Sequence, residues 1–155
     1  MWSYPWASPV KDPTRPGPRS ESPGLRSKRI LVVDDEVAIR DLLVRTLSGK
    51  GYVVDIAADG EEALRAVQRK NYDGLITDLK MPNLGGQELY ENLESMDRGL
   101  ARRVVFMTGD TASPESRAFI AATGNSLIEK PFDLAEVLRQ LRNALEAELP
   151  GARDG

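Results

Sequence analysis

Residues 75–82 read LITDLKMP, an apolar run that stops at the acid Asp78 and is followed by a lysine and a Met-Pro pair. The run suits a sheet interior because it is short, apolar and partly β-branched. Met81-Pro82 prevents a helix from starting directly after it, and Gly85-Gly86 gives the following loop backbone freedom. Asp78 is therefore either a reacting group or merely the first polar residue after a strand.

The same pattern, a short apolar run followed by an amphipathic stretch, occurs five times from Arg29 onward. We predict strands over Ile30–Val33, Tyr52–Ala57, Gly74–Thr77, Arg103–Met107 and Ser126–Ile128. Apolar residues recur at helical spacing within residues 37–47, 63–67, 89–96, 118–121 and 134–145. Strict alternation of strand and helix predicts an α/β fold, a doubly wound five-stranded parallel sheet (βα)5 with the flavodoxin-like strand order 2-1-3-4-5.

Three expected helices carry recognisable start signals. Asp59 precedes two glutamates, Ser113 precedes a first-turn proline and an acid, and Asp133 precedes the last amphipathic stretch. Short polar side chains at these places satisfy backbone N–H groups that lack a partner within the helix. We therefore expect helices to begin directly after Asp59, Ser113 and Asp133.

Composition excludes several classes of chemistry. The chain of 155 residues contains no cysteine and no histidine, so disulfides, thiolate or histidine metal sites and Ser-His-Asp catalysis are ruled out. An apolar content of 41% is enough for one core of domain size. No apolar run approaches the roughly 20 residues that span a bilayer, and neither a signal peptide nor a membrane segment is expected. The sequence is compatible with a cytoplasmic location.

The chain divides into a leader over residues 1–28, one domain over residues 29–148 and a short tail over residues 149–155. Six of the ten prolines lie in residues 1–23, among Ser, Gly and basic residues, so the leader is expected to be flexible. Its net charge is +3, which leaves −6 for residues 29–155. An acidic domain argues against non-specific binding of nucleic acid.

Chemically reactive side chains follow four of the five expected strands. Asp34 and Asp35 follow the first strand, Asp78 the third, Thr108 the fourth and Lys130 the fifth. Each has a structural explanation by itself, because acids cap helices and strand ends are solvated. In a sheet of order 2-1-3-4-5, however, these four strand ends lie side by side, and sites gather there.

The predicted set of side chains suits a phosphoryl group held beside a metal ion. Three clustered carboxylates repel one another unless a hard cation binds them, and an all-oxygen site of this kind suits Mg²⁺. A cation, an ammonium and a hydroxyl neutralise and orient phosphoryl oxygens. One carboxylate can then act as the nucleophile and form an acyl phosphate.

These residues and their spacing resemble the receiver domain of two-component response regulators. The resemblance covers roughly Arg29 to Ala147 and rests on four motifs in the order of the family: LVVDDE, LITDLKMPNLGGQEL, VVFMTGD and IEKPFD. It implies Mg²⁺ as the cofactor, ligated directly by Asp35, largely through water by Asp34, and by Asp78 and the backbone carbonyl of Lys80.

The resemblance also implies the chemistry. Asp78 would accept a phosphoryl group from the phosphohistidine of a histidine kinase or histidine phosphotransfer protein. Thr108 would move toward the phosphoryl oxygens, and Lys130 would bridge carboxylate and phosphate. Lys130-Pro131 is a candidate cis peptide bond. Such a domain catalyses its own phosphorylation and dephosphorylation without being a conventional turnover enzyme, and this chain carries no kinase core.

Three positions bear on signalling and on the lifetime of the phosphate. The family commonly has an aromatic residue three positions before the site lysine, where this chain has Leu127, so output is expected to involve a smaller adjustment or passage of the phosphate to another protein. Lys80 and Asp110 occupy the two family positions that modulate hydrolysis of the acyl phosphate. We hypothesise that they pair across the mouth of the site.

Several alternatives stay open at this point. A receiver that only docks a partner without being phosphorylated would keep the fold, and a phosphatase of the haloacid dehalogenase type also uses an aspartyl nucleophile. That enzyme needs a second acid where this chain has Lys80. A flavodoxin-like flavin binder would need a glycine- and hydroxyl-rich loop where Asp34 and Asp35 stand. The short tail fits a stand-alone receiver or the terminal receiver of a hybrid kinase, and the oligomeric state is undetermined.

Overall fold

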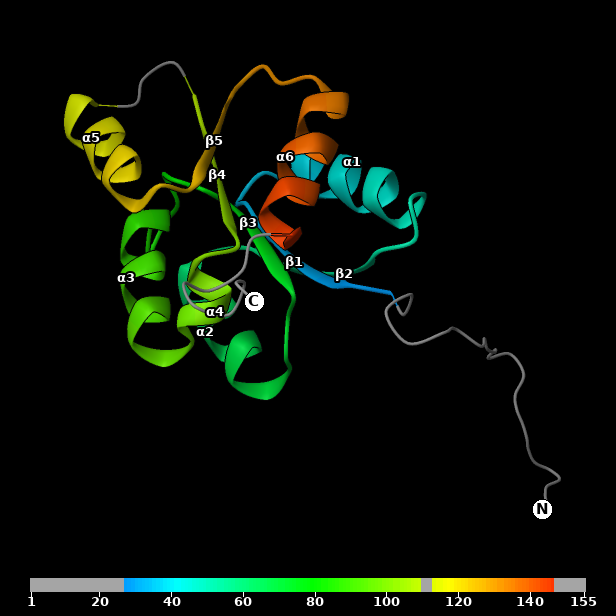
Figure 1. The fold of residues 1–155 in the computed structure, drawn as a ribbon, viewed down its shortest axis with the longest axis horizontal. Helices are drawn as coiled ribbons and strands as arrows, with labels where there is room; N and C mark the ends of the chain where they lie inside the picture. The colour runs from blue at the N-terminus through cyan, green and yellow to red at the C-terminus, as the bar shows by residue number, and fades with distance from the viewer. Residues whose placement is uncertain (1–26, 110–112, 147–155) are drawn as a thin grey trace, which may run out of the picture.

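A computed structural model describes residues 27–109 and 113–146. Its five strands form one parallel sheet in the order β2-β1-β3-β4-β5 (Figure 1). The strands are β1 (Arg29–Val33), β2 (Val53–Ala57), β3 (Gly74–Asp78), β4 (Val104–Thr108) and β5 (Ser126–Glu129). The predicted fold class and strand order are therefore confirmed.

The helices cover both faces of the sheet. They are α1 (Val37–Ser48), α2 (Gly60–Arg69), α3 (Gly86–Met96), α4 (Arg98–Ala101), α5 (Pro114–Thr123) and α6 (Leu134–Glu146). In Figure 1, α1 and α6 lie on one side of the sheet, and α2, α3, α4 and α5 lie on the other. Right-handed crossovers between parallel strands produce this arrangement of two helical layers.

The core consists of two apolar clusters separated by the sheet. On β1, Leu31 and Val33 face the cluster of α2, α3, α4 and α5, whereas Ile30 and Val32 face the cluster of α1 and α6. All four side chains are fully buried, because β1 is flanked by strands on both sides and covered by helices on both faces. Continuous apolar runs, rather than alternating ones, are therefore the sequence signature of the inner strands.

The predicted caps hold three helices in place. Asp59 accepts a hydrogen bond from the backbone N–H of Glu62, and Ser113 accepts one from the N–H of Ser116. The Asp133 carboxylate accepts one from the N–H of Ala135 at 3.1 Å. Each bond satisfies a donor at a helix start that would otherwise lack a partner.

One helix was not expected from the sequence. Residues 98–101 form the short helix α4, whose start is capped by Asp97 through the N–H of Leu100 at 3.1 Å. A single helical turn has too few residues to display an apolar period, so pattern reasoning misses it. The strands also differ by one residue from their predicted ends. β1 begins at Arg29, β2 at Val53 and β4 at Val104, and the last residues of β3, β4 and β5 are Asp78, Thr108 and Glu129.

A polar cluster supports the edge of the sheet around Asp55 of β2. Its carboxylate accepts a hydrogen bond of 2.7 Å from the Tyr72 hydroxyl and lies 3.4 Å from both Arg29 and Lys70. Partial burial raises the pKa of Asp55, but the bond from Tyr72 and the Lys70 ammonium outweigh it, so the net pKa is below its usual value. The cluster joins β1, β2 and the connection from α2 to β3.

Within the described ranges, no helix combines the length and the apolar character that crossing a bilayer demands. The predicted leader lies almost entirely outside the described residues, since the description begins at residue 27. The predicted tail over residues 149–155 also lies outside them.

Candidate functional site

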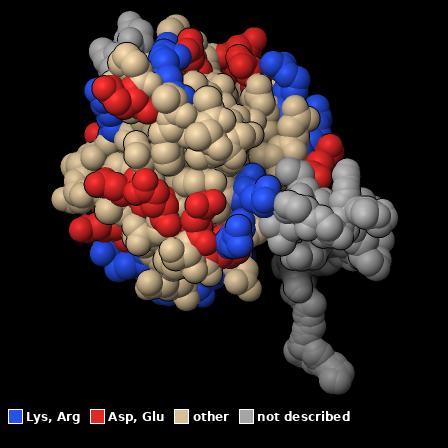
Figure 2. Space-filling view, turned by 60° about the vertical axis from the view of Figure 1, so that its left-hand side comes forward, with Lys and Arg blue, Asp and Glu red and all other residues tan. Residues whose placement is uncertain are grey.

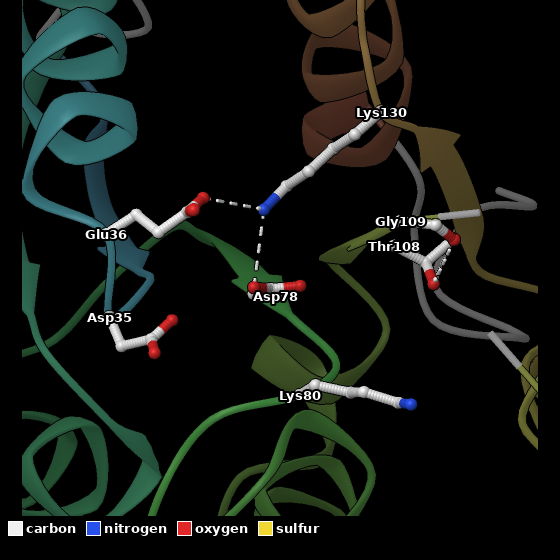
Figure 3. Close-up of a pocket in the computed structure, with 7 residues that line it drawn as sticks. All are labelled: Asp35, Glu36, Asp78, Lys80, Thr108, Gly109 and Lys130. Carbon is white, nitrogen blue, oxygen red and sulfur yellow. Dashed lines mark hydrogen bonds and ion pairs between the residues drawn. The ribbon is translucent and has the colours of Figure 1, made fainter. Parts of the chain in front are cut away.

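The carboxyl ends of β1, β3, β4 and β5 meet around one open pocket of about 320 Å³ (Figure 3). It is lined by Asp35, Glu36, Asp78, Lys80, Thr108, Gly109 and Lys130. Parallel strands place their carboxyl ends at the same edge, so residues 96 positions apart in the chain come within contact distance. The structure thus brings together the strand-end residues that the sequence singled out.

Lys130 is the charged centre of the pocket. Its ammonium lies 3.3 Å from Asp34 Oδ2, 3.3 Å from Asp78 Oδ2 and 3.5 Å from Glu36 Oε1. Figure 3 shows the lysine reaching down from the end of β5, with its nitrogen between Glu36 and Asp78. One cation therefore neutralises carboxylates contributed by the ends of two different strands.

Asp34 directly follows β1 and is completely buried, so it contacts Lys130 without lining the open pocket. Its Oδ1 accepts a hydrogen bond from the N–H of Glu36 at 2.9 Å, while Oδ2 faces Lys130. Burial and the negative charge of Asp78 raise the pKa of Asp34, and these effects outweigh the Glu36 bond and the lysine. A divalent cation beside Asp34 would favour its ionised form.

Asp78 and Lys130 shift each other's pKa in opposite directions: the lysine lowers that of the acid, and the acid raises that of the lysine. Burial raises the pKa of Asp78, although the lysine beside it favours the carboxylate. Burial lowers the pKa of Lys130, but the charges of Asp78 and Asp34 outweigh that effect, so the net pKa is above its ordinary value. Lys130 is therefore a stable cation against which a second negative group can be held.

Three carboxylates are arranged so that they could hold a metal ion. One oxygen each from Asp34, Asp35 and Asp78 lies within 4.8 Å of the other two. Asp35 is exposed, whereas Asp34 and Asp78 are buried. Oxygen ligands on one side and an open mouth for water on the other suit Mg²⁺, which keeps several waters of its own.

Thr108 and Lys80 flank Asp78 on the side opposite Asp35 (Figure 3). The Thr108 hydroxyl donates to the carbonyl of Gly109 at 3.2 Å, so it does not contact Asp78 in this conformation. The Lys80 side chain extends away from Asp35 and Glu36. Both residues line the pocket, so a ligand that projects from Asp78 into it would lie near them.

Glycine is needed at position 86 because a Cβ would not fit there. The expectation that Gly85-Gly86 supplies backbone freedom is therefore wrong for the described conformation. Neither residue has a positive φ; among the described glycines, only Gly51 and Gly124 do. A Cβ at Gly86 would lie 2.5 Å from the carbonyl oxygen of Asp78. The Gly86 N–H donates to Leu79 at 2.9 Å, so α3 begins in direct contact with the backbone of the acid.

Two further predicted positions are described. The Lys130–Pro131 peptide bond is cis. Leu127 is partly buried and packs against the apolar cluster that contains Tyr90 and Phe106. Asp110 lies outside the described residues, so the hypothesised pairing with Lys80 stays a prediction.

Sequence reasoning missed two contributors to the site. Glu36 contacts Lys130, and Arg40 donates from its guanidinium to the backbone carbonyl of Asp34 at 3.1 Å. Arg40 lies four residues after Glu36, one helical turn into α1, and this spacing is the signal that could have placed it beside the strand end. Glu36 directly follows Asp34 and Asp35 in the acidic run after the first predicted strand, and this adjacency is the signal that could have placed it in the site.

The structure resembles solved receivers over most of its length. A receiver domain protein from Methanospirillum hungatei is 32% identical, with a TM-score of 0.72, and the match covers 77% of this chain and 94% of that one. The response regulator TrrA from Thermotoga maritima, solved in complex with Mg²⁺ and BeF, is 32% identical with a TM-score of 0.66; 76% of this chain and 98% of that chain are covered.

The sequence comparisons agree with the structural ones. The response regulator MprA of Mycobacterium leprae is 38% identical over 122 residues, which are 79% of this chain and 53% of that protein. The chain thus spans about half the length of the curated relatives it matches. These comparisons favour a receiver over a phosphatase or a flavin binder. Because the model of the response regulator receiver domain matches residues 30–142, this chain belongs to the receiver domain family of two-component signalling.

Proposed function

We propose that Asp78 accepts a phosphoryl group from the phosphohistidine of a histidine kinase or histidine phosphotransfer protein. The observation that carries this proposal is the position of Lys130, whose ammonium lies 3.3 Å from Asp78 while an open pocket remains beside the carboxylate. The cytoplasm, where such kinases present their phosphohistidine, is the location we expect. The domain receives and passes a signal, and phosphorylation by a partner controls it.

The transfer is an in-line displacement at phosphorus. A carboxylate oxygen of Asp78 attacks, the P–N bond to the partner's imidazole breaks, and the nitrogen keeps the electron pair and is reprotonated. Lys130 pairs with the charge that gathers on the phosphoryl oxygens, and Thr108 rotates from Gly109 to donate to one of them. Asp78 sits at the end of a fully buried strand, which holds the nucleophile in place.

The proposed metal is Mg²⁺, held by Asp34, Asp35, Asp78 and the backbone carbonyl of Lys80. When bound, it would neutralise charge on the carboxylates and on the incoming phosphoryl oxygens. Asp35 is the most accessible of the three acids and would bind the ion directly, whereas buried Asp34 already accepts from Glu36 and Lys130 and would act mainly through water. The donor set is entirely oxygen, as Mg²⁺ requires.

The experiment is incubation of the chain with Mg²⁺ and acetyl phosphate, a small phosphodonor, followed by assay for acid-stable, base-labile phosphate. Wild type is compared with Asp78→Asn and with Asp41→Asn, which makes the same change at an exposed position of α1. We expect label in wild type and Asp41→Asn and none in Asp78→Asn. If wild type gains no phosphate under conditions that label another receiver, the domain is a docking module and the proposal is wrong.

The lifetime of the phosphate is proposed to depend on Lys80 and Asp110. Lys80 lines the same open pocket as Asp78, so its side chain could restrict the access of water to a phosphoryl group there. Dephosphorylation of Lys80→Ala and Asp110→Ala is the relevant measurement, and we expect both to change the rate because each removes a charge from the mouth of the site. Unchanged rates in both variants would eliminate this role.

Output is proposed to run through small repacking around Leu127. This side chain lies on β5 and packs against the same cluster as Phe106 of β4 and Phe119 of α5, whose rings are 6.0 Å apart. Rotation of Thr108 at the end of β4 would therefore be transmitted to α5 by contact between packed side chains.

A further inference from the structure

A second pocket, of about 370 Å³, lies between α6 and the connection from α1 to β2. One wall is a single face of α6, made of Ala135, Leu138, Arg139 and Arg142, and the other wall is made of Lys50 and Tyr52. Tyr52 directly precedes β2, so this wall stands at the amino end of a strand, opposite the edge that carries Asp78. None of its lining residues belongs to the phosphorylation pocket.

The floor of this pocket is apolar and its rim is basic. Tyr52 and Leu138 are partly buried and pack against the core cluster shared by α1 and α6, which lie side by side in Figure 1. Lys50, Arg139 and Arg142 are exposed around the opening. A rigid floor with flexible cations above it can admit a small anion without disturbing the core.

The charge of the rim differs from the charge of the domain. Residues 29–155 carry a net charge of −6, and acidic side chains gather across the left and centre of the face seen in Figure 2. Yet no carboxylate is among the six lining residues, and no ion pair between described residues includes any of the three rim cations. Like charges held around one hollow repel, and a bound anion would relieve that repulsion.

We propose that this pocket binds a ligand with two or more linked phosphate groups. Arg139 and Arg142, three residues apart on one helix face, offer guanidinium forks that match phosphate oxygens, and Lys50 adds a point charge from the opposite wall. The volume lies within the range of small-molecule sites. Inorganic pyrophosphate and the phosphate tail of a nucleotide share this chemistry, and only a nucleotide would also place a ring against Tyr52.

The test is a titration of the whole chain in the presence of EDTA and without Mg²⁺. Binding is monitored through the chemical shifts of the backbone amides in NMR spectra. Pyrophosphate, ATP, adenosine and poly-glutamate are the four probes. We expect pyrophosphate and ATP to shift the amides of residues 50–52 and 135–142, and adenosine to have no effect there. If ATP binds more tightly than pyrophosphate, the natural ligand is a nucleotide. If the two bind equally, the pocket recognises the linked phosphates alone. Shifts confined to the Asp78 pocket, or tighter binding of poly-glutamate at these amides, overturn the proposal.

The matched variants are Arg139→Gln/Arg142→Gln in α6 and Arg65→Gln/Arg69→Gln in α2. Both remove two exposed arginines on one helix face, so the net charge of the chain changes equally. We expect about tenfold weaker binding of pyrophosphate for the α6 variant, because two solvent-exposed ion pairs are lost, and wild-type binding for the α2 variant. Equal weakening in both variants would refute a specific site. Labelling of Asp78 by acetyl phosphate should persist in both, which separates this proposal from the proposed function.

Discussion

Replacement of Gly86 by alanine should destabilise the domain at its phosphorylation site. The added Cβ would stand 2.5 Å from the Asp78 carbonyl oxygen, 3.1 Å from Leu79 Cα and 3.3 Å from the Asp78 carbonyl carbon. All three are backbone atoms, so α3 must move away from the end of β3. Overpacking of this kind costs about 1–3 kcal/mol. Alanine gains roughly 0.5–1 kcal/mol over glycine within a helix, which offsets only part of that cost.

Urea unfolding measured beside Gly99→Ala provides the assay and its control. Gly99 lies in α4, and a Cβ there would meet only side-chain atoms, the nearer being the Asp97 carboxylate at 3.6 Å. We expect Gly86→Ala to lower the free energy of unfolding by about 1–2 kcal/mol and Gly99→Ala to leave it unchanged or slightly higher. Because the displaced oxygen belongs to Asp78, labelling by acetyl phosphate should also be slower in Gly86→Ala. Equal stabilities for Gly86→Ala and wild type would refute the close approach.

Three further predictions concern polar contacts and the metal. Asp55→Asn should lower the free energy of unfolding by about 1 kcal/mol at neutral pH. Because the pKa of Asp55 is lower in the folded state than in the unfolded state, its stabilising effect is complete above the unfolded-state pKa and is lost as the pH falls through the folded-state pKa. The stabilities of wild type and variant, measured by unfolding at decreasing pH, should therefore converge in acid. Asn125→Ala should cost about 1–3 kcal/mol in urea unfolding, since its amide donates to the carbonyls of Ala101 at 2.8 Å and Val104 at 2.9 Å, and a smaller loss would argue against these bonds. Mg²⁺ should raise the thermal unfolding midpoint; at an Mg²⁺ concentration one hundred times the dissociation constant, the added stability is about 2.7 kcal/mol. Asp35→Asn should abolish most of this rise, and an unchanged rise would show that Asp35 does not bind the metal.

The fold was predictable because its signals are local. Each inner strand is a short apolar run, and Asp59, Ser113 and Asp133 mark helix starts in the printed sequence. Parallel connectivity requires the strand ends to share one edge, which predicts from the sequence alone that Asp78 lies near Lys130. The turn of α4 escaped because four residues are too few to show a helical period.

The site was predictable only in part. The residue types at four strand ends indicated an oxygen-rich cation site with one lysine, since that chemistry depends on which groups are present. The contact of Glu36 with Lys130 and the bond from Arg40 to the Asp34 carbonyl depend on the angle at which α1 leaves β1. Such angles result from packing against the sheet, so the four-residue spacing indicates that Glu36 and Arg40 share one side of the start of α1 but not which groups they contact.

By itself, the sequence determined that LITDLKMP ends a buried strand in an acid and that this acid belongs to a set with Asp34, Asp35, Thr108 and Lys130. The tertiary structure decided how much room surrounds that acid: Gly86 lets α3 touch its backbone, and Lys130 reaches it across the pocket. It also assembled the basic pocket from Lys50 and α6, which are far apart in the chain. Hydrophobic periodicity and helix caps act over a few residues, whereas close approach and charge clustering are properties of segments brought together by folding.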